Sequence, residues 1–241
     1  MKPAASIALR AAVALAATAL IALAIWYGYD SLARRPIVAV SFAGDAGRVP
    51  AADLDRLAAG LRGREARDVA LPAVRDAVRR LPWVRDCTVR RLFPGTLKVT
   101  IEAHEPLARW DETRLVSARG EVFAASFEGE LPRFAGPEGT AAEMAAAWPG
   151  IRRAAEPLAI PIAELRLSER RAWQARLASG LAIDLGRAQV EARLGRFAAA
   201  WPRIAAEAAE ATRADLRYPN GFALRGIARA KPRPAPRGAR A

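Results

Sequence analysis

Residues 81–103 read LPWVRDCTVRRLFPGTLKVTIEA, and this stretch decides the fold of the first domain. Apolar and polar side chains alternate from Leu97 to Ala103, which is typical of a strand with one buried face. Pro94-Gly95 is a strong turn signal, and a second strand is predicted before it, from Trp83 to Phe93. A hairpin with one apolar face requires a second layer of structure that covers this face.

Two amphipathic helices precede the hairpin and are expected to form this layer. Their apolar residues recur at helical spacing in two stripes, which are Leu54, Leu57, Ala58 and Leu61, then Leu71, Val74, Val78 and Leu81. A short strand from Ile37 to Phe42 comes before both helices. The predicted order is therefore strand, helix, helix, strand, strand, with both helices packed on one face of a small mixed sheet.

After Pro106 the sequence predicts a strand-rich region with flanking helices, so the fold class is α+β. Pro202 is expected to kink the last helix or to begin a new segment, because proline removes a helix hydrogen bond. The expected elements are a hairpin over 115–123, a helix over 140–148, a strand region over 162–167, a hairpin over 173–185 and a long helix from 190.

The end of this region carries the sharpest hairpin signal of the chain. Ala214, Leu216 and Tyr218 alternate with charged residues, and Asn220-Gly221 then favours a type I′ turn, which needs positive φ at both central residues. A final strand is expected to follow the turn. The residues from 228 to 241 alternate among proline, basic residues and small residues, cannot build a core, and are expected to be disordered.

A transmembrane anchor is predicted near the N-terminus. No charged residue occurs from Ala11 to Tyr29, which is close to the roughly 20 residues that a helix needs to cross a bilayer. Trp26 and Tyr27 stand at the end of the run, where aromatic rings favour the membrane interface. The alternative is a cleaved signal peptide, with Ala22-Leu23-Ala24 as its cleavage site. Both interpretations export the body of the protein.

The sequence offers no catalytic constellation. Cys87 is the single cysteine, so no intrachain disulfide can form, and its place on an apolar strand face predicts a buried structural thiol. His104 is the single histidine. Metal-ligand spacing, a glycine-rich phosphate loop and a nucleophile elbow are all missing from the sequence. We therefore predict no enzyme, no metal and no cofactor, and we ascribe the net charge of +13 to an arginine-rich surface.

Three stretches in this order resemble the FtsQ/DivIB family of bacterial cell-division proteins. They run from Leu81 through Pro94 to Val99, from Glu105 through Trp110 to Phe123, and from Asp215 to Ala223. The resemblance implies a POTRA domain followed by an FtsQ-type β domain. The domain limits expected from it are a cytoplasmic tail at 1–10, a transmembrane helix at 11–29, a POTRA domain at 36–105, a β domain at 106–227 and a basic tail at 228–241.

The resemblance also implies a function and partners. Members of this family are non-catalytic scaffolds of the inner membrane that link early and late division proteins during septum formation. The implied partners are FtsB and FtsL, with further division proteins on the POTRA domain, and neither nucleic acid nor a small-molecule substrate is expected. The implied topology is a single-pass type II protein with a cytoplasmic N-terminus and a periplasmic body, enriched at the division septum.

The expected binding site is the last strand, which should lie at a sheet edge and add a partner strand. Residues that match or extend the family's binding segment are Arg217, Tyr218, Asn220, Phe222 and Leu224, with Arg171 as a contact on a neighbouring strand. Gly226 stands where some members carry a tryptophan. The alternative for Leu216 and Tyr218 is that both pack inward as core residues.

The sequence leaves three alternative functions to compare with this one. The chain could be another POTRA-type periplasmic adaptor for envelope assembly or secretion, but no tandem POTRA repeat is visible in the sequence. A membrane-anchored enzyme would need a polar constellation. Nucleic-acid binding through the basic tail conflicts with export of the body.

Overall fold

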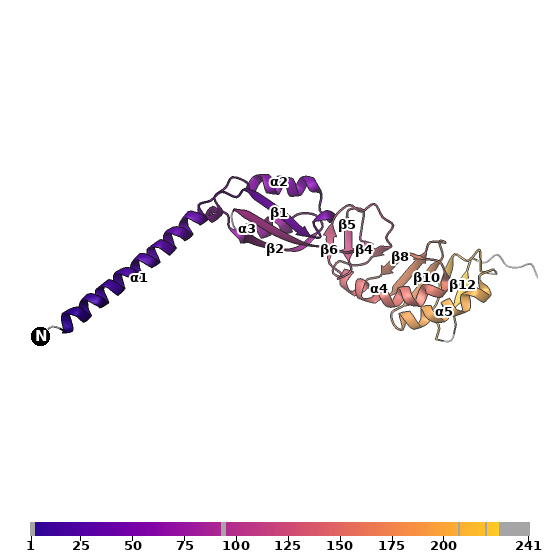
Figure 1. Ribbon diagram of the computed structural model, residues 1–241. Coiled ribbons are helices and arrows are strands. Elements are labelled where there is room, and N and C mark those ends of the chain that lie inside the picture. Colours follow the sequence, from indigo (N-terminus) through magenta and orange to yellow (C-terminus); the bar gives the residue numbers. More distant parts are fainter. Residues whose placement is uncertain (1–2, 93–94, 207, 220, 227–241) are drawn as a thin grey trace, which may run out of the picture. The chain divides into compact units, whose positions relative to one another are not determined.

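The computed structural model describes residues 3–92, 95–206, 208–219 and 221–226, and it divides into two compact units, Met1–His104 and Glu105–Ala241 (Figure 1). The first element is helix α1, Pro3–Ala33. Within it, Ala12–Ser31 is the one stretch of the described residues that is long and apolar enough to cross a membrane, and its side chains are exposed. The tail predicted at 228–241 lies outside the described residues.

The remainder of the first unit has the predicted order of strand, helix, helix, strand, strand. Its sheet has the order β1-β3-β2, in which β3 pairs in parallel with β1 and antiparallel with β2. The elements are β1 (Ala39–Gly44), α2 (Ala51–Leu61), α3 (Leu71–Arg79), β2 (Val84–Leu92) and β3 (Thr96–Ala103).

One hydrophobic core joins both predicted helix stripes to the hairpin. Leu54 and Leu61 of α2 and Val74 and Val78 of α3 are buried together with Leu97, Val99 and Ile101 of β3. Cys87 of β2 belongs to the same core, and burial raises the pKa of its thiol. The prediction of a buried structural thiol is confirmed.

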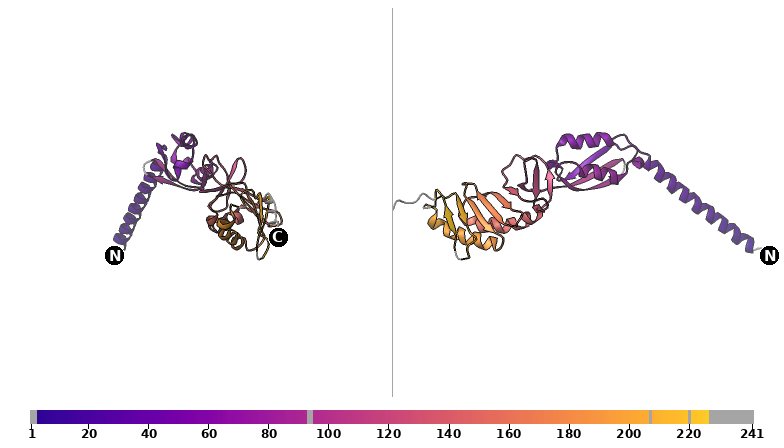
Figure 2. Two further views of the ribbon diagram at one scale, coloured as in Figure 1. Left: turned by 90° about the vertical axis from the view of Figure 1, so that its right-hand side faces the viewer. Right: turned by 180° about the vertical axis from the view of Figure 1, so that it is seen from behind.

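The second unit is built on a nine-stranded sheet with the order β12-β11-β10-β9-β8-β7-β4-β5-β6. Helices α4 (Ala141–Ala155) and α5 (Val190–Ile204) lie together along one side of this sheet (Figures 1 and 2). The strands are β4 (Pro106–Arg109), β5 (Arg114–Ser117), β6 (Val122–Ala124), β7 (Arg133–Ala135), β8 (Ile162–Leu167), β9 (Trp173–Leu177), β10 (Ala182–Gly186), β11 (Arg213–Asp215) and β12 (Ala223–Arg225).

The two helices are crossovers between parallel strands. Helix α4 connects β7 to β8, and α5 connects β10 to β11, and both of these strand pairs are parallel. A parallel pair cannot be closed by a tight turn and needs such a crossover. Inward residues of both helices, including Met144, Trp148, Leu194 and Phe197, form the core with the strands.

Both helices contain a proline, and α4 differs there from its predicted form, whereas for α5 one of the two predicted outcomes is excluded. Helix α4 does not end at Trp148 but continues through Pro149 to Ala155, because Ile151 and Ala155 extend its buried stripe. Helix α5 likewise runs through Pro202 to Ile204, so this proline begins no new segment. Packing against the sheet outweighs the single hydrogen bond that each proline removes.

The last hairpin is wider than predicted. Strand β11 ends at Asp215 and β12 begins at Ala223, so seven residues connect them instead of a two-residue turn. The strand ends early because the backbone N–H of Arg217 donates to Asp215 Oδ1 at 3.0 Å, which turns the chain out of the ladder. Asn220 lies outside the described residues.

Candidate protein-interaction edge

Strand β12 is the terminal strand of the nine-stranded sheet (Figure 1). The N–H of Thr212 donates to the carbonyl of Arg225 at 3.0 Å, so this carbonyl faces β11. Because successive residues of a strand present their backbone groups to opposite sides, the N–H and carbonyl of Leu224 face away from β11. No strand in the described part of the chain pairs with this outer side.

The register places the other predicted contacts at the same end of the sheet. Trp173 at the start of β9 pairs with Gly186, and Asp184 of β10 pairs with Asp215, which pairs in turn with Ala223. The turn that holds Arg171 and the described residues 216–219 and 221–222 therefore lie at one end of four neighbouring strands. Strands are about 4.8 Å apart, so β9 and β12 are separated by roughly 15 Å.

The predicted residues differ in how far they reach into solvent. Tyr218 is 53% exposed, whereas Leu216 is 2% exposed. The inward alternative is therefore correct for Leu216 and wrong for Tyr218. Phe222 and Leu224 are partly buried against the core, and the ring of Phe222 meets the ring of Phe197 edge to face at 5.0 Å. Phe222 and Leu224 therefore also contribute to the stability of the second unit.

A buried carboxylate holds Arg217 in place. Asp215 is 7% exposed and accepts from Arg217 Nε at 2.8 Å and from Nη2 at 2.6 Å. This bidentate pair lowers the pKa of Asp215 and raises that of Arg217. The guanidinium itself stays largely in solvent, so Asp215 positions a cationic group at this end of the sheet.

A second buried acid repeats this arrangement on the next strand. Asp184 accepts from Arg213 Nε at 2.5 Å and Nη2 at 2.9 Å, and from Gln174 Nε2 at 2.8 Å. The same carboxylate raises the pKa of Arg213. These bonds link side chains of the three neighbouring strands β9, β10 and β11 across the face of the sheet.

Arg171 does not lie on a strand next to β12, as expected, but occupies the turn between β8 and β9. It has a φ of +60°, and its N–H donates to the carbonyl of Ser168 at 2.9 Å. Its side chain forms an ion pair with Glu143 of α4. A partner that binds the Arg171 side chain would therefore either break its ion pair with Glu143 or contact both side chains together.

Sequence reasoning missed four residues of this site, which are Asp184, Gly186, Arg193 and Asp215. Gly186 has a φ of +80°, and a Cβ there would lie 2.6 Å from Arg193 Nη1 and 3.3 Å from Arg217 Cγ. Because Gly186 has no side chain, the side chains of Arg193 and Arg217 can both lie close to its backbone. Asp215 stands two residues before Arg217, and this spacing could have indicated that the two side chains form an ion pair. No such signal exists for Arg193, which reaches the site only because α5 crosses the sheet.

Asp215→Asn is expected to reduce the free energy of unfolding at neutral pH and to flatten its dependence on acid pH. The folded-state pKa of Asp215 is lowered, so the stabilisation is complete above the unfolded pKa of about 4 and is lost as pH falls through the folded value. Urea unfolding near pH 7 and near pH 3 tests this, because the difference between wild type and variant should shrink at the lower pH. An equal difference at both pH values would contradict it.

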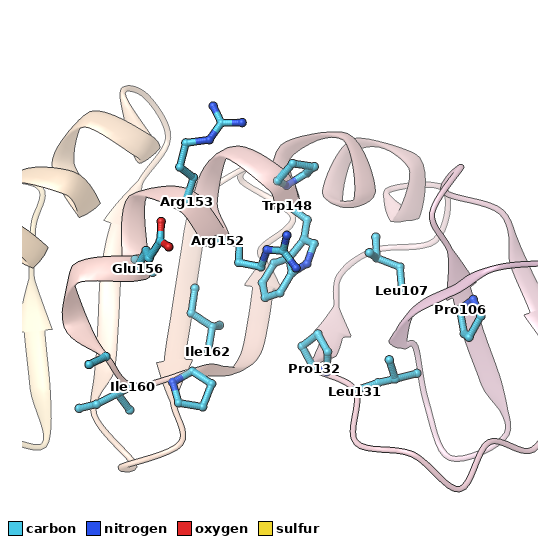
Figure 3. A pocket seen from close by; sticks show the side chains of 14 residues that line it. Pro106, Leu107, Leu131, Pro132, Trp148, Arg152, Arg153, Glu156, Ile160 and Ile162 are labelled. Carbon is cyan, nitrogen blue, oxygen red and sulfur yellow. The ribbon is translucent and has the colours of Figure 1, made fainter.

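A separate groove of about 800 Å³ lies between β4, the segment before β7, α4 and β8 (Figure 3). Its walls are mostly apolar, and Figure 3 shows Trp148, Leu107 and Pro132 around it, with Arg153 pointing away. Glu156 is the one carboxylate among its lining residues. The described residues also contain no cluster of three or more His, Cys, Asp or Glu placed to hold a metal ion.

The fold and the edge together define a class of protein. An apolar N-terminal helix precedes a β-α-α-β-β domain and a strand-rich domain. The last strand of the described residues, β12, pairs with β11 on one side only, which is an architecture suited to protein–protein contact. The family profile "POTRA domain, FtsQ-type" matches residues 35–104, and the profile "Cell division protein FtsQ/DivIB, C-terminal" matches residues 108–217.

Curated relatives agree with these profiles. The chain is 33% identical to the cell division protein FtsQ of Xanthomonas campestris over 215 residues, which cover 88% of this chain and 77% of the relative. It is 40% identical to the FtsQ protein of Burkholderia pseudomallei over 65% of this chain, and 39% identical to that of Bordetella pertussis, also over 65%. The chain covers 66% and 65% of these two relatives. It belongs to the FtsQ/DivIB family of cell-division proteins.

Proposed function

We propose that this protein is a non-catalytic scaffold of the cell-division machinery that binds FtsB, together with FtsL, in the periplasm during septum formation. Membership of the FtsQ/DivIB family supports a role in division. The proposed topology is single-pass type II in the inner membrane, with α1 as the anchor, the N-terminus in the cytoplasm and enrichment at the septum. Lys2 and Arg10 before the apolar run favour this orientation.

The observation that carries the proposal is the unpaired outer side of β12. An exposed strand edge offers its free N–H and carbonyl groups to a partner strand, and Leu224 presents such groups here. Tyr218 and Arg217 project beside the edge, and tyrosine and arginine are frequent anchors of protein interfaces. Backbone pairing would supply affinity, and these side chains would supply selectivity.

The anchor contributes to the proposed binding by confinement. FtsB and FtsL are themselves membrane proteins in the proposed assembly, so all partners share the plane of one membrane. Confinement raises their effective concentration and lets an edge of modest affinity remain occupied.

The POTRA domain is proposed to bind further division proteins. Its strand β2 is a terminal strand of the three-stranded sheet and could pair with a partner strand.

Depletion of the protein in its host is expected to produce filamentous cells with unseparated septa. Expression of the wild-type protein should restore normal cell division. Tyr218→Ala should fail to restore division, because it removes an exposed anchor, and its purified form should keep the wild-type Tm to within about 2 °C. The measurements are cell length, co-purification with FtsB and thermal unfolding.

Tyr218→Phe is the matched control, since it keeps the ring and should retain most of the function. Normal division after depletion would refute the scaffold role. Undiminished FtsB binding by Tyr218→Ala would refute the placement of the site.

A further inference from the structure

A small pocket of about 380 Å³ lies directly beside the proposed binding edge. Its buried walls are Phe197 and Leu216, which are 0% and 2% exposed. Four described residues of the connection between β11 and β12 line the pocket, and Phe222 directly precedes the first residue of β12. The lining residues are Arg193, Arg196, Phe197, Leu216, Pro219, Gly221 and Phe222.

Two arginines of this pocket differ from the other arginines of the sheet end. Arg213 and Arg217 each hold a buried aspartate, whereas Arg193 and Arg196 have no carboxylate partner among the residues that the structure describes. Arg193 Nη1 donates to the carbonyl of Leu185 at 2.9 Å, and its buried Nε has no hydrogen-bond partner within the described ranges. A buried donor without a partner is costly, and more so in a charged group.

The two cationic groups share one face of α5. Arg193 and Arg196 are three residues apart, which places them next to each other on a helix surface. Two like charges over an apolar floor lower the energy of an anion that binds between them. A lining that combines two arginines with the apolar side chains of Phe197, Leu216 and Phe222 suits a carboxylate that is attached to an apolar stem.

We propose that this pocket receives the side chain of a glutamate or aspartate from the protein partner that pairs with β12. This inference rests on the proposed function and adds a selectivity element to it. The occupant is a protein side chain rather than a free anion because the pocket wall continues into the binding strand. An adjacent apolar residue of the partner would pack on Phe222, whose ring is already held by Phe197.

The acidic contact would set the register of the added strand. Backbone hydrogen bonds are the same in every register, and a shift by one residue exchanges the two faces of a strand. One carboxylate that must reach Arg193 and Arg196 penalises every other register. The pocket would therefore reject strands that lack an acid at the required position.

The test compares two charge reversals on one helix in the full-length protein. Arg196→Glu is expected to weaken binding of the periplasmic segment of the host's FtsB about tenfold or more. Arg203→Glu, two helical turns further along and outside the pocket, makes the same charge change and should weaken binding less than about twofold. Both arginines are exposed, so both variants should keep the wild-type Tm.

A second arm identifies the acid. Each aspartate and glutamate of the FtsB segment is replaced by lysine, and one such variant should recover binding to Arg196→Glu in a double-mutant cycle. Equal effects of Arg196→Glu and Arg203→Glu, or the absence of any rescuing lysine, would overturn the pocket proposal and leave the edge proposal standing. A wild-type protein that does not bind the segment would overturn the proposed function itself.

Discussion

Leu224→Pro is expected to weaken binding of the periplasmic FtsB segment by about a hundredfold or more. Proline removes the N–H that Leu224 presents to the outer side of β12, and its ring obstructs an approaching strand. The ladder to β11 should survive, because Ala223 and Arg225 form the inward pairs with Asp215 and Arg213. The measurement is the Kd of the FtsB segment for the full-length protein.

Leu224→Ala is the matched control for this experiment. Leu224 is partly buried, so both variants lose the same packing and should lose about 1–3 kcal/mol of stability. Only the proline variant also loses the outward N–H. Similar Kd values for the two variants would show that the partner does not pair with the edge of β12.

Phe197→Ala is expected to cost about 3–5 kcal/mol of unfolding free energy. The ring is 0% exposed and contacts Trp201 at 5.4 Å and Phe222 at 5.0 Å between centroids. Its removal would leave a cavity between α5 and the sheet and would release Phe222 from the wall of the pocket. Urea unfolding followed by tryptophan fluorescence measures the loss.

Phe197→Leu separates packing from the aromatic contact. Leucine fills much of the cavity, so this variant should lose clearly less stability than Phe197→Ala. FtsB binding should weaken in both variants at temperatures where they remain folded, because neither supports Phe222 with a ring. A Phe197→Ala protein as stable as wild type would show that α5 does not depend on this ring.

The first unit could be predicted almost completely from local patterns. The alternation from Leu97 to Ala103 and the two helix stripes each describe one element, and each stripe is buried as expected. Five short elements in sequence leave few ways to bury three apolar faces together. The sequence therefore determined this domain without information on distant contacts.

The second unit depended on contacts that no local pattern contains. Strand β7 has three residues, too few for a visible period, and its pairing partners β4 and β8 lie far apart in the chain. The extension of α4 past Pro149 likewise follows from burial against the sheet. Local propensity was overruled at these points by tertiary packing.

The candidate site shows the same division at the level of single residues. Alternation places Ala214, Leu216 and Tyr218 on one face, yet the first two are buried and Tyr218 is exposed. The difference arises at Asp215, where a side-chain hydrogen bond to Arg217 ends the strand. A strand pattern holds only as far as the ladder that supports it.

By itself, the sequence determined the apolar helix, the order of elements in the first domain and the segment after Asp215 as the place to search for contacts. The sequence also predicted that the last strand lies at a sheet edge, and only the tertiary structure decided that the turn with Arg171 shares its sheet end and that Arg193 lies over Gly186. The physical reason is the separation along the chain of the residues that interact. Side-chain periodicity is set by neighbours along the chain, whereas strand order and helix crossing are set by how all apolar faces are buried at once.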